Sequence, residues 1–116
     1  MIRKIYKFGG ASVKDANAVR NLRNILEKEN RNEIMLIVSA MGKTTNALER
    51  VFAAMQKGDK AEAHNEIEQI VAYHAEIIND LWGEPTQLDE VNALFAELRS
   101  IIDNTVYRLQ DAELWY

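Results

Sequence analysis

The fold is decided by the stretch Ile34-Met35-Leu36-Ile37-Val38, five consecutive apolar residues between polar neighbours. A short unbroken apolar run is typical of a strand that is covered on both faces, as in a parallel sheet. Upstream, residues 2–8 include β-branched and aromatic side chains and stop at Gly9-Gly10, which predicts a first strand running into a turn. From about Lys14 to Glu29, apolar residues recur every three or four positions, which predicts a helix. Strand, helix and strand together predict a βαβ unit.

After Val38 the sequence is helical in pattern. We expect one helix from Thr44 or Thr45 to Lys57, followed by Gly58, and a second from Lys60 to about Leu81, stopped by Gly83-Glu84-Pro85. A long amphipathic helix should then begin near Thr86 and reach Leu109, and the last two helices should form an antiparallel hairpin. The predicted fold class is α/β: a βαβ unit followed by three helices.

Length and composition limit the classes of function that this chain can have. The 116 residues suit one domain, and no linker or repeat divides them into two. Eighteen acidic against fourteen basic side chains, a net charge of -4, disfavour nucleic acid as a partner. The absence of cysteine excludes zinc-thiolate sites and cysteine nucleophiles. The apolar runs are too short for a membrane span or a signal peptide, so we expect a cytoplasmic protein.

Two loops leave the carboxyl ends of the predicted strands. The first, Lys7 to Ser12, pairs a lysine with adjacent glycines, whose amides can approach and bind an anion. The second, Ser39 to Asn46, carries hydroxyls suited to orienting a small polar substrate. Neighbouring parallel strands bring such loops to one sheet edge, where open α/β sheets bind ligands. Each loop also has a plainer interpretation: a tight turn beside a solvated lysine, and a helix cap at Thr44 or Thr45.

Common phosphate motifs do not fit. Gly42-Lys43-Thr44 would need a glycine at position 37, which is Ile37, so it is no P-loop. Gly9 and Gly10 are adjacent, which excludes the dinucleotide fingerprint. His74 lies in an apolar stripe and is interpreted as a hydrogen-bonded core or interface residue, so no metal site is expected.

Together the loops resemble a known family. Residues 7–13, Lys7-Phe8-Gly9-Gly10-Ala11-Ser12-Val13, are similar to the aspartokinase signature K-F-G-G-[TS]-S-V, and residues 38–48 resemble the aspartokinase block V-S-A-x-x-x-x-T-N-x-L. The resemblance implies the amino-acid kinase fold and ATP-dependent phosphorylation of the side-chain carboxylate of L-aspartate. The product would be 4-phospho-L-aspartate, on the route to lysine, threonine and methionine. Ala11 departs from the pattern, because relatives usually have a hydroxyl there.

Residue roles follow from the same resemblance. Lys7 would be catalytic, contacting the transferring phosphoryl group and offsetting its charge. Lys7, Phe8, Gly9, Gly10 and Ser12 would bind the ATP phosphates, with Mg²⁺ accompanying ATP and no metal ligand from the protein. Ser39 and Thr45 would bind aspartate.

Relatives in this family continue for several hundred residues. We therefore expect residues 1–116 to be the amino-terminal portion of a catalytic domain, too short to be active alone and prone to form homo-oligomers through exposed helical faces. Two alternatives stay open: a helical interaction or regulatory module built on residues 60–110, and another carboxylate kinase of the same fold.

Overall fold

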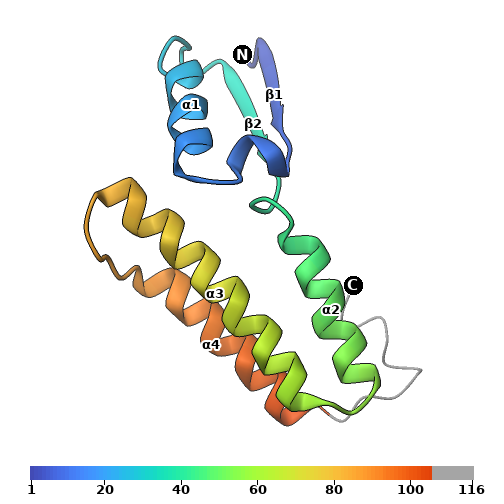
Figure 1. The fold of residues 1–116 in the computed structure, drawn as a ribbon. Coiled ribbons are helices and arrows are strands. Elements are labelled where there is room, and N and C mark those ends of the chain that lie inside the picture. Colours follow the sequence, from blue (N-terminus) through green and yellow to red (C-terminus); the bar gives the residue numbers. More distant parts are fainter. Residues whose placement is uncertain (106–116) are drawn as a thin grey trace.

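The structure, a computed structural model, describes residues 1–105 as two strands followed and separated by helices (Figure 1). In chain order these are β1 (Lys4–Phe8), the short 3₁₀ helix η1 (Gly10–Val13), α1 (Ala16–Leu26), β2 (Ile34–Val38), α2 (Thr44–Gln56), α3 (Lys60–Trp82) and α4 (Asp89–Asn104). The predicted α/β class and the order of the elements are confirmed. No helix among the described residues is both long enough and apolar enough to cross a membrane.

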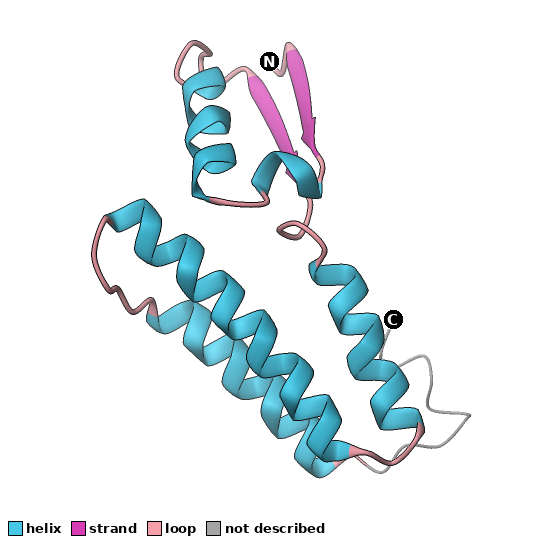
Figure 2. Ribbon diagram, in the orientation of Figure 1, coloured by secondary structure: helices cyan, strands magenta, loops and turns pink. Residues whose placement is uncertain are grey.

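The βαβ unit is built as expected. β1 and β2 pair in parallel, with Lys4 opposite Ile34 and Phe8 opposite Val38 (Figure 2). Asp15 caps α1 by accepting a 2.8 Å hydrogen bond from the Ala18 amide. The 3₁₀ helix between the first glycine and this cap was not foreseen.

α1 is shorter than the predicted helix of residues 14–29. It ends at Leu26, and the chain turns so that Glu29 faces β1 instead. There the Glu29 carboxylate accepts hydrogen bonds from the Tyr6 hydroxyl at 2.5 Å and from the Lys4 ammonium at 3.0 Å. Tyr6 also stacks on Phe8, so Lys4, Tyr6 and Phe8 share the face of β1 on which Glu29 lies.

The prediction that β2 is covered on both faces is wrong for the described residues. Four of its five side chains remain 42–48% exposed: Met35, Leu36, Ile37 and Val38. A strand of this composition needs a layer on each face, but α2, α3 and α4 pack together, away from the sheet (Figure 1).

The core lies among the last three helices. α3 and α4 run antiparallel, as predicted, and α2 packs against α3 (Figure 1). The most completely buried large side chains come from all three helices: Val51, Met55, Ile67 and Ile102. α3 is closed at both ends, by the Asp59 carboxylate on the Glu62 amide and by Gly83 in the left-handed conformation, as the helix-stop signals indicate.

α4 is shorter than expected. It begins at Asp89 rather than near Thr86, because the amide and hydroxyl of Thr86 are held in the preceding loop by Asn79 and Glu84. It ends at Asn104, and Thr105 has an extended backbone. The predicted helical residues Val106 and Leu109 lie outside the described residues.

The hydrogen bonds to Glu29 make the stability of the folded chain depend on pH. Hydrogen bonds from Tyr6 and Lys4 hold the pKa of Glu29 below its ordinary value of 4.5. A lowered folded-state pKa contributes stability that is present above pH 4.5 and is lost as the pH falls through the folded-state value.

We therefore expect the melting temperature to fall less between about pH 6 and about pH 3 in Glu29→Gln than in the parent chain. Glu49→Gln, which removes an exposed carboxylate on α2, is the control and should keep the parent's slope. Identical acid slopes for the parent and Glu29→Gln, measured by circular dichroism, would contradict this assignment.

Candidate functional site

The two loops singled out in the sequence leave the same edge of the sheet. Phe8 and Val38 are the last paired residues of β1 and β2, and the next amide, that of Ser39, donates a 2.9 Å hydrogen bond to the Phe8 carbonyl. The pairing therefore continues into the second loop. The first loop turns away at Gly9, so both loops begin at one point (Figure 1).

Gly10 and Gly42 join these loops directly. The Gly42 amide donates a 3.0 Å hydrogen bond to the Gly10 carbonyl. A Cβ atom on Gly10 would collide with the Gly42 carbonyl oxygen, and Gly42 itself has a φ of +57°, in the left-handed region. Both positions thus require glycine for backbone reasons.

Gly9 differs from its neighbour. Apart from Gly9 and its two chain neighbours, no atom lies within 4 Å of the place where a Gly9 Cβ would stand, and its φ of −77° and ψ of 177° suit any residue. Neither packing nor backbone strain explains a glycine here. Its lack of a side chain leaves the first loop open to close approach from solvent, which a ligand would use.

Lys7 lies on the exposed side of this edge. Strand alternation puts it on the face of β1 opposite Tyr6 and Phe8, together with Ile5, which is 66% exposed. Lys4 is paired with Glu29, whereas no carboxylate among residues 1–105 pairs with Lys7. A free ammonium group therefore stands one residue before the end of the paired strand.

The second loop places its hydroxyls unevenly. Thr44 donates a 2.6 Å hydrogen bond to the Met41 carbonyl and is the first residue of α2. The N-cap is Lys43, which makes no capping bond from its side chain, so the interpretation of Thr44 or Thr45 as the cap is wrong. Ser39 and Thr45 are exposed, and neither side chain has a hydrogen-bond partner among the described residues.

Ser12 ends the first loop and lies within η1. Its amide donates to the Gly9 carbonyl at 3.0 Å, within the turn that starts η1, while its side chain is exposed. The structure thus brings the backbones of Phe8, Gly10, Ser39 and Gly42 together. The roles proposed for the side chains of Lys7, Ser12, Ser39 and Thr45 stay predictions.

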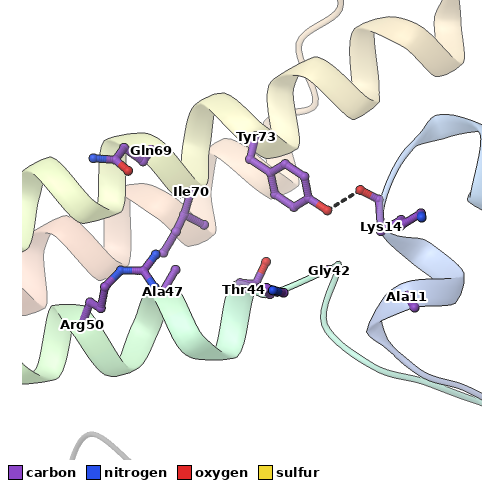
Figure 3. Close-up of a pocket in the computed structure, with 10 residues that line it drawn as sticks. Ala11, Lys14, Gly42, Thr44, Ala47, Arg50, Gln69, Ile70 and Tyr73 are labelled. Carbon is purple, nitrogen blue, oxygen red and sulfur yellow. Dashed lines mark hydrogen bonds between the residues drawn. The ribbon is translucent and has the colours of Figure 1, made fainter.

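Sequence reasoning missed Tyr73 of α3. Its hydroxyl donates a hydrogen bond to the Lys14 carbonyl and fills the space beside Gly42 (Figure 3). Burial, with the charge of Asp15, raises the pKa of Tyr73, so the hydroxyl keeps its proton at neutral pH. The available signal was a tyrosine three residues after Ile70, at the border of the apolar stripe of α3.

The two histidines make other contacts and do not belong to a group of metal ligands in the described part of the chain. His74 Nδ1 is 2.8 Å from the Ile70 carbonyl oxygen and its ring meets Phe95 edge-on, so His74 is hydrogen-bonded and half-buried, in keeping with the interpretation as a core or interface residue. His64 Nε2 lies 2.7 Å from the Asp103 carboxylate. Within residues 1–105, no three His, Asp, Glu or Cys side chains gather as metal ligands would.

The adjacent glycines give a matched pair of variants. We expect Gly10→Ala to lower the free energy of unfolding by about 1–3 kcal/mol, because the new methyl group meets backbone that cannot move aside cheaply. Gly9→Ala should leave it unchanged or raise it by about 0.5 kcal/mol, because only the unfolded chain is restricted. Urea denaturation measures both, and equal losses would show that Gly10 has no special contact.

Comparison with known proteins agrees with this geometry. The amino acid kinase family matches residues 3–106. An aspartokinase of Bacillus sp. (strain MGA3) is 48% identical over 46 residues, 38% of this chain and 11% of that protein. The bifunctional aspartokinase/homoserine dehydrogenase 2 of Escherichia coli (strain K12) is 29% identical over 99 residues, 85% of this chain and 12% of that protein.

A solved structure supports the fold. The crystal structure of Clostridium acetobutylicum aspartate kinase superposes with a TM-score of 0.71 at 23% identity, over 88% of this chain and 24% of that one. The chain thus spans about a quarter of that structure and about a tenth of the curated relatives. Because the family match runs through both strands, both loops and all four α-helices, the chain belongs to the amino acid kinase family.

Proposed function

We propose that residues 1–116 form the amino-terminal portion of the catalytic domain of an aspartate kinase. The observation that carries this proposal is the contact between Gly10 and Gly42, which joins at one sheet edge the two loops that resemble aspartokinase blocks. The names of the relatives, an aspartokinase and a bifunctional aspartokinase, support the same activity.

The proposed reaction transfers the γ-phosphoryl group of ATP to aspartate. An oxygen of the side-chain carboxylate attacks the γ-phosphorus, the bond to the bridging oxygen breaks, and ADP leaves, giving 4-phospho-L-aspartate. Catalysis of this kind works by positioning and by offsetting charge, without a covalent enzyme intermediate. The product would serve lysine, threonine and methionine synthesis.

The first loop would hold the phosphates. Lys7, unpaired within the described chain, would offset the charge that develops on the transferring group. Gly9 leaves room for a phosphate near the backbone, and Gly10 begins η1, where amides have no acceptor within the helix. Phe8 and Ser12 flank these positions and would line the same subsite.

The second loop would hold aspartate. The exposed hydroxyls of Ser39 and Thr45 have no partner among residues 1–105, so they are available to a polar substrate. Thr45 is in the first turn of α2, where free backbone amides favour a carboxylate.

Mg²⁺ would arrive with ATP. No carboxylate belongs to residues 7–13 or 39–46, and the nearby Asp15 is engaged as the α1 cap. This set of side chains fits a Mg²⁺ ion held by phosphate oxygens and water rather than by protein carboxylates. Because the proposed reaction consumes ATP, we also propose that the protein is cytoplasmic.

A chimera tests the proposal. The 99-residue segment of the E. coli bifunctional relative that aligns with this chain is replaced by the matching residues of this chain. We expect the chimera to phosphorylate aspartate, and Lys7→Ala within it to reduce kcat by about a hundredfold or more, since a charge that stabilises the transition state is lost.

The homoserine dehydrogenase activity of the chimera reports on folding, and Lys28→Ala, a solvent-exposed lysine after α1, is the matched control. A Lys7→Ala chimera that phosphorylates aspartate at the parent's rate would overturn the role of Lys7. Rapid turnover by the isolated 116-residue chain would contradict the expectation that it is too short to act alone.

We also propose that the chain self-associates through α4. Leu94 and Ile101 are 66% and 44% exposed and lie seven residues apart, so they share one face of that helix. Such an interaction module is the second candidate function. Exposed apolar residues also occur on the sheet, as Ile5 and Met35 show, which provides a contrast.

Sedimentation velocity decides whether α4 is used. We expect a dimer at micromolar concentration that Leu94→Glu converts to a monomer, because a charge cannot be buried in an apolar interface without a partner. Met35→Glu, on the sheet, should leave the dimer intact. A chain that is strictly monomeric, or a dimer broken only by Met35→Glu, would contradict this proposal.

A further inference from the structure

A cavity lies beside the residues assigned to ATP and aspartate and shares other residues of the two loops with the candidate site. It measures about 530 Å³ and opens between η1 and Lys14 on one side and α2 and α3 on the other (Figure 3). Its lining comes from η1, α2, α3, the second loop and the residue that follows η1: Ala11, Lys14, Gly42, Lys43, Thr44, Ala47, Arg50, Gln69, Ile70 and Tyr73. None of the seven residues assigned to ATP or aspartate lines it, so it is a separate pocket of a size typical for small ligands.

The inner wall of the pocket is apolar and well fixed. Ala47 and Ile70 are 8% and 4% exposed and belong to the core that joins α2 to α3. The Tyr73 ring forms a third side, and its hydroxyl is already engaged with the Lys14 carbonyl (Figure 3). The wall therefore offers contact to a compact apolar group rather than a hydrogen bond.

The rim of the pocket is cationic. Lys14, Lys43 and Arg50 line it and no acidic residue does, although the whole chain has a net charge of -4. Arg50 is paired with Glu66 at 3.1 Å. Lys14 and Lys43 have no ion-pair partner among residues 1–105, so two of the lysines that line the pocket are uncompensated.

Two hydrogen-bonding side chains complete the rim. Gln69 contributes an amide on the α3 side. Thr44 lies opposite, at the first turn of α2, where the helix dipole adds to the positive potential of the lysines. Apolar depth, a cationic rim and polar side chains are the combination that selects an anion with an apolar body.

We propose that this pocket binds a small organic anion, a carboxylate attached to a compact apolar group. The carboxylate lies between Lys14 and Lys43, and the apolar group rests against Ala47, Ile70 and the ring of Tyr73. The assignment rests on the pocket alone and holds whether or not the chain is part of an aspartate kinase.

Amide chemical shifts of the 116-residue chain test the proposal, with benzoate as the probe. We expect saturable shifts at Gly42, Thr44, Ala47 and Tyr73. Benzamide, which has the same shape without the charge, should bind at least about tenfold more weakly, because a charge-assisted hydrogen bond is lost. Inorganic phosphate, an anion without an apolar group, should also bind at least about tenfold more weakly.

Substitution of the rim lysines tests whether benzoate binds at the rim of this pocket. The double variant Lys14→Met with Lys43→Met keeps the aliphatic stems and should weaken benzoate binding at least about tenfold. Lys28→Met, a solvent-exposed lysine after α1 and outside the pocket, is the matched control and should bind as the parent does. In the absence of benzoate, α3 amide shifts that match those of the parent confirm that each variant is folded.

Several results would overturn the proposal. These are an absence of saturable shifts with benzoate, shifts confined to the exposed residues of β2, benzamide or phosphate binding as tightly as benzoate, and a double variant with the parent's affinity. The proposed kinase function is tested separately by the Lys7→Ala chimera, so failure of one does not imply failure of the other.

Discussion

The close approach of Gly10 and Gly42 is the constraint on which the arrangement of this protein depends. One backbone hydrogen bond there connects the loop after β1 to the loop before α2, and no side chain fits between them. Because α2 leads directly into the helical core, this contact also fixes how the sheet lies relative to the helices (Figure 1). Two glycines thereby set the geometry of both loops.

α3 supports the same junction from the other side. Tyr73 donates to the Lys14 carbonyl, and Arg20 of α1 donates a 2.5 Å hydrogen bond to the Asp80 carbonyl near the end of α3. These polar contacts connect the βαβ unit to a helix whose own packing is with α2 and α4. α3 therefore helps to hold in place the loops that the proposed reaction needs.

Free positive charge gathers at this junction. Lys7 lies at the strand edge, and Lys14 and Lys43 lie at the neighbouring pocket, all without ion pairs in the described chain. Some cations elsewhere are paired, as Lys4 with Glu29 and Arg99 with Glu68. An acidic protein that leaves unpaired lysines around one pair of loops has a local potential suited to anions, which both proposals use.

The sequence by itself determined the local elements: β2 at residues 34–38, the Gly83 stop and the helical hairpin, because periodicity and helix-stop signals are local properties. It also indicated that the two loops meet. Only the tertiary structure decided which glycine is required by packing, since Gly9 and Gly10 differ in their neighbours and not in their chemistry. The role of Tyr73, the exposure of β2 and the cationic pocket were likewise decided by contacts between residues far apart in the chain, which no local pattern encodes.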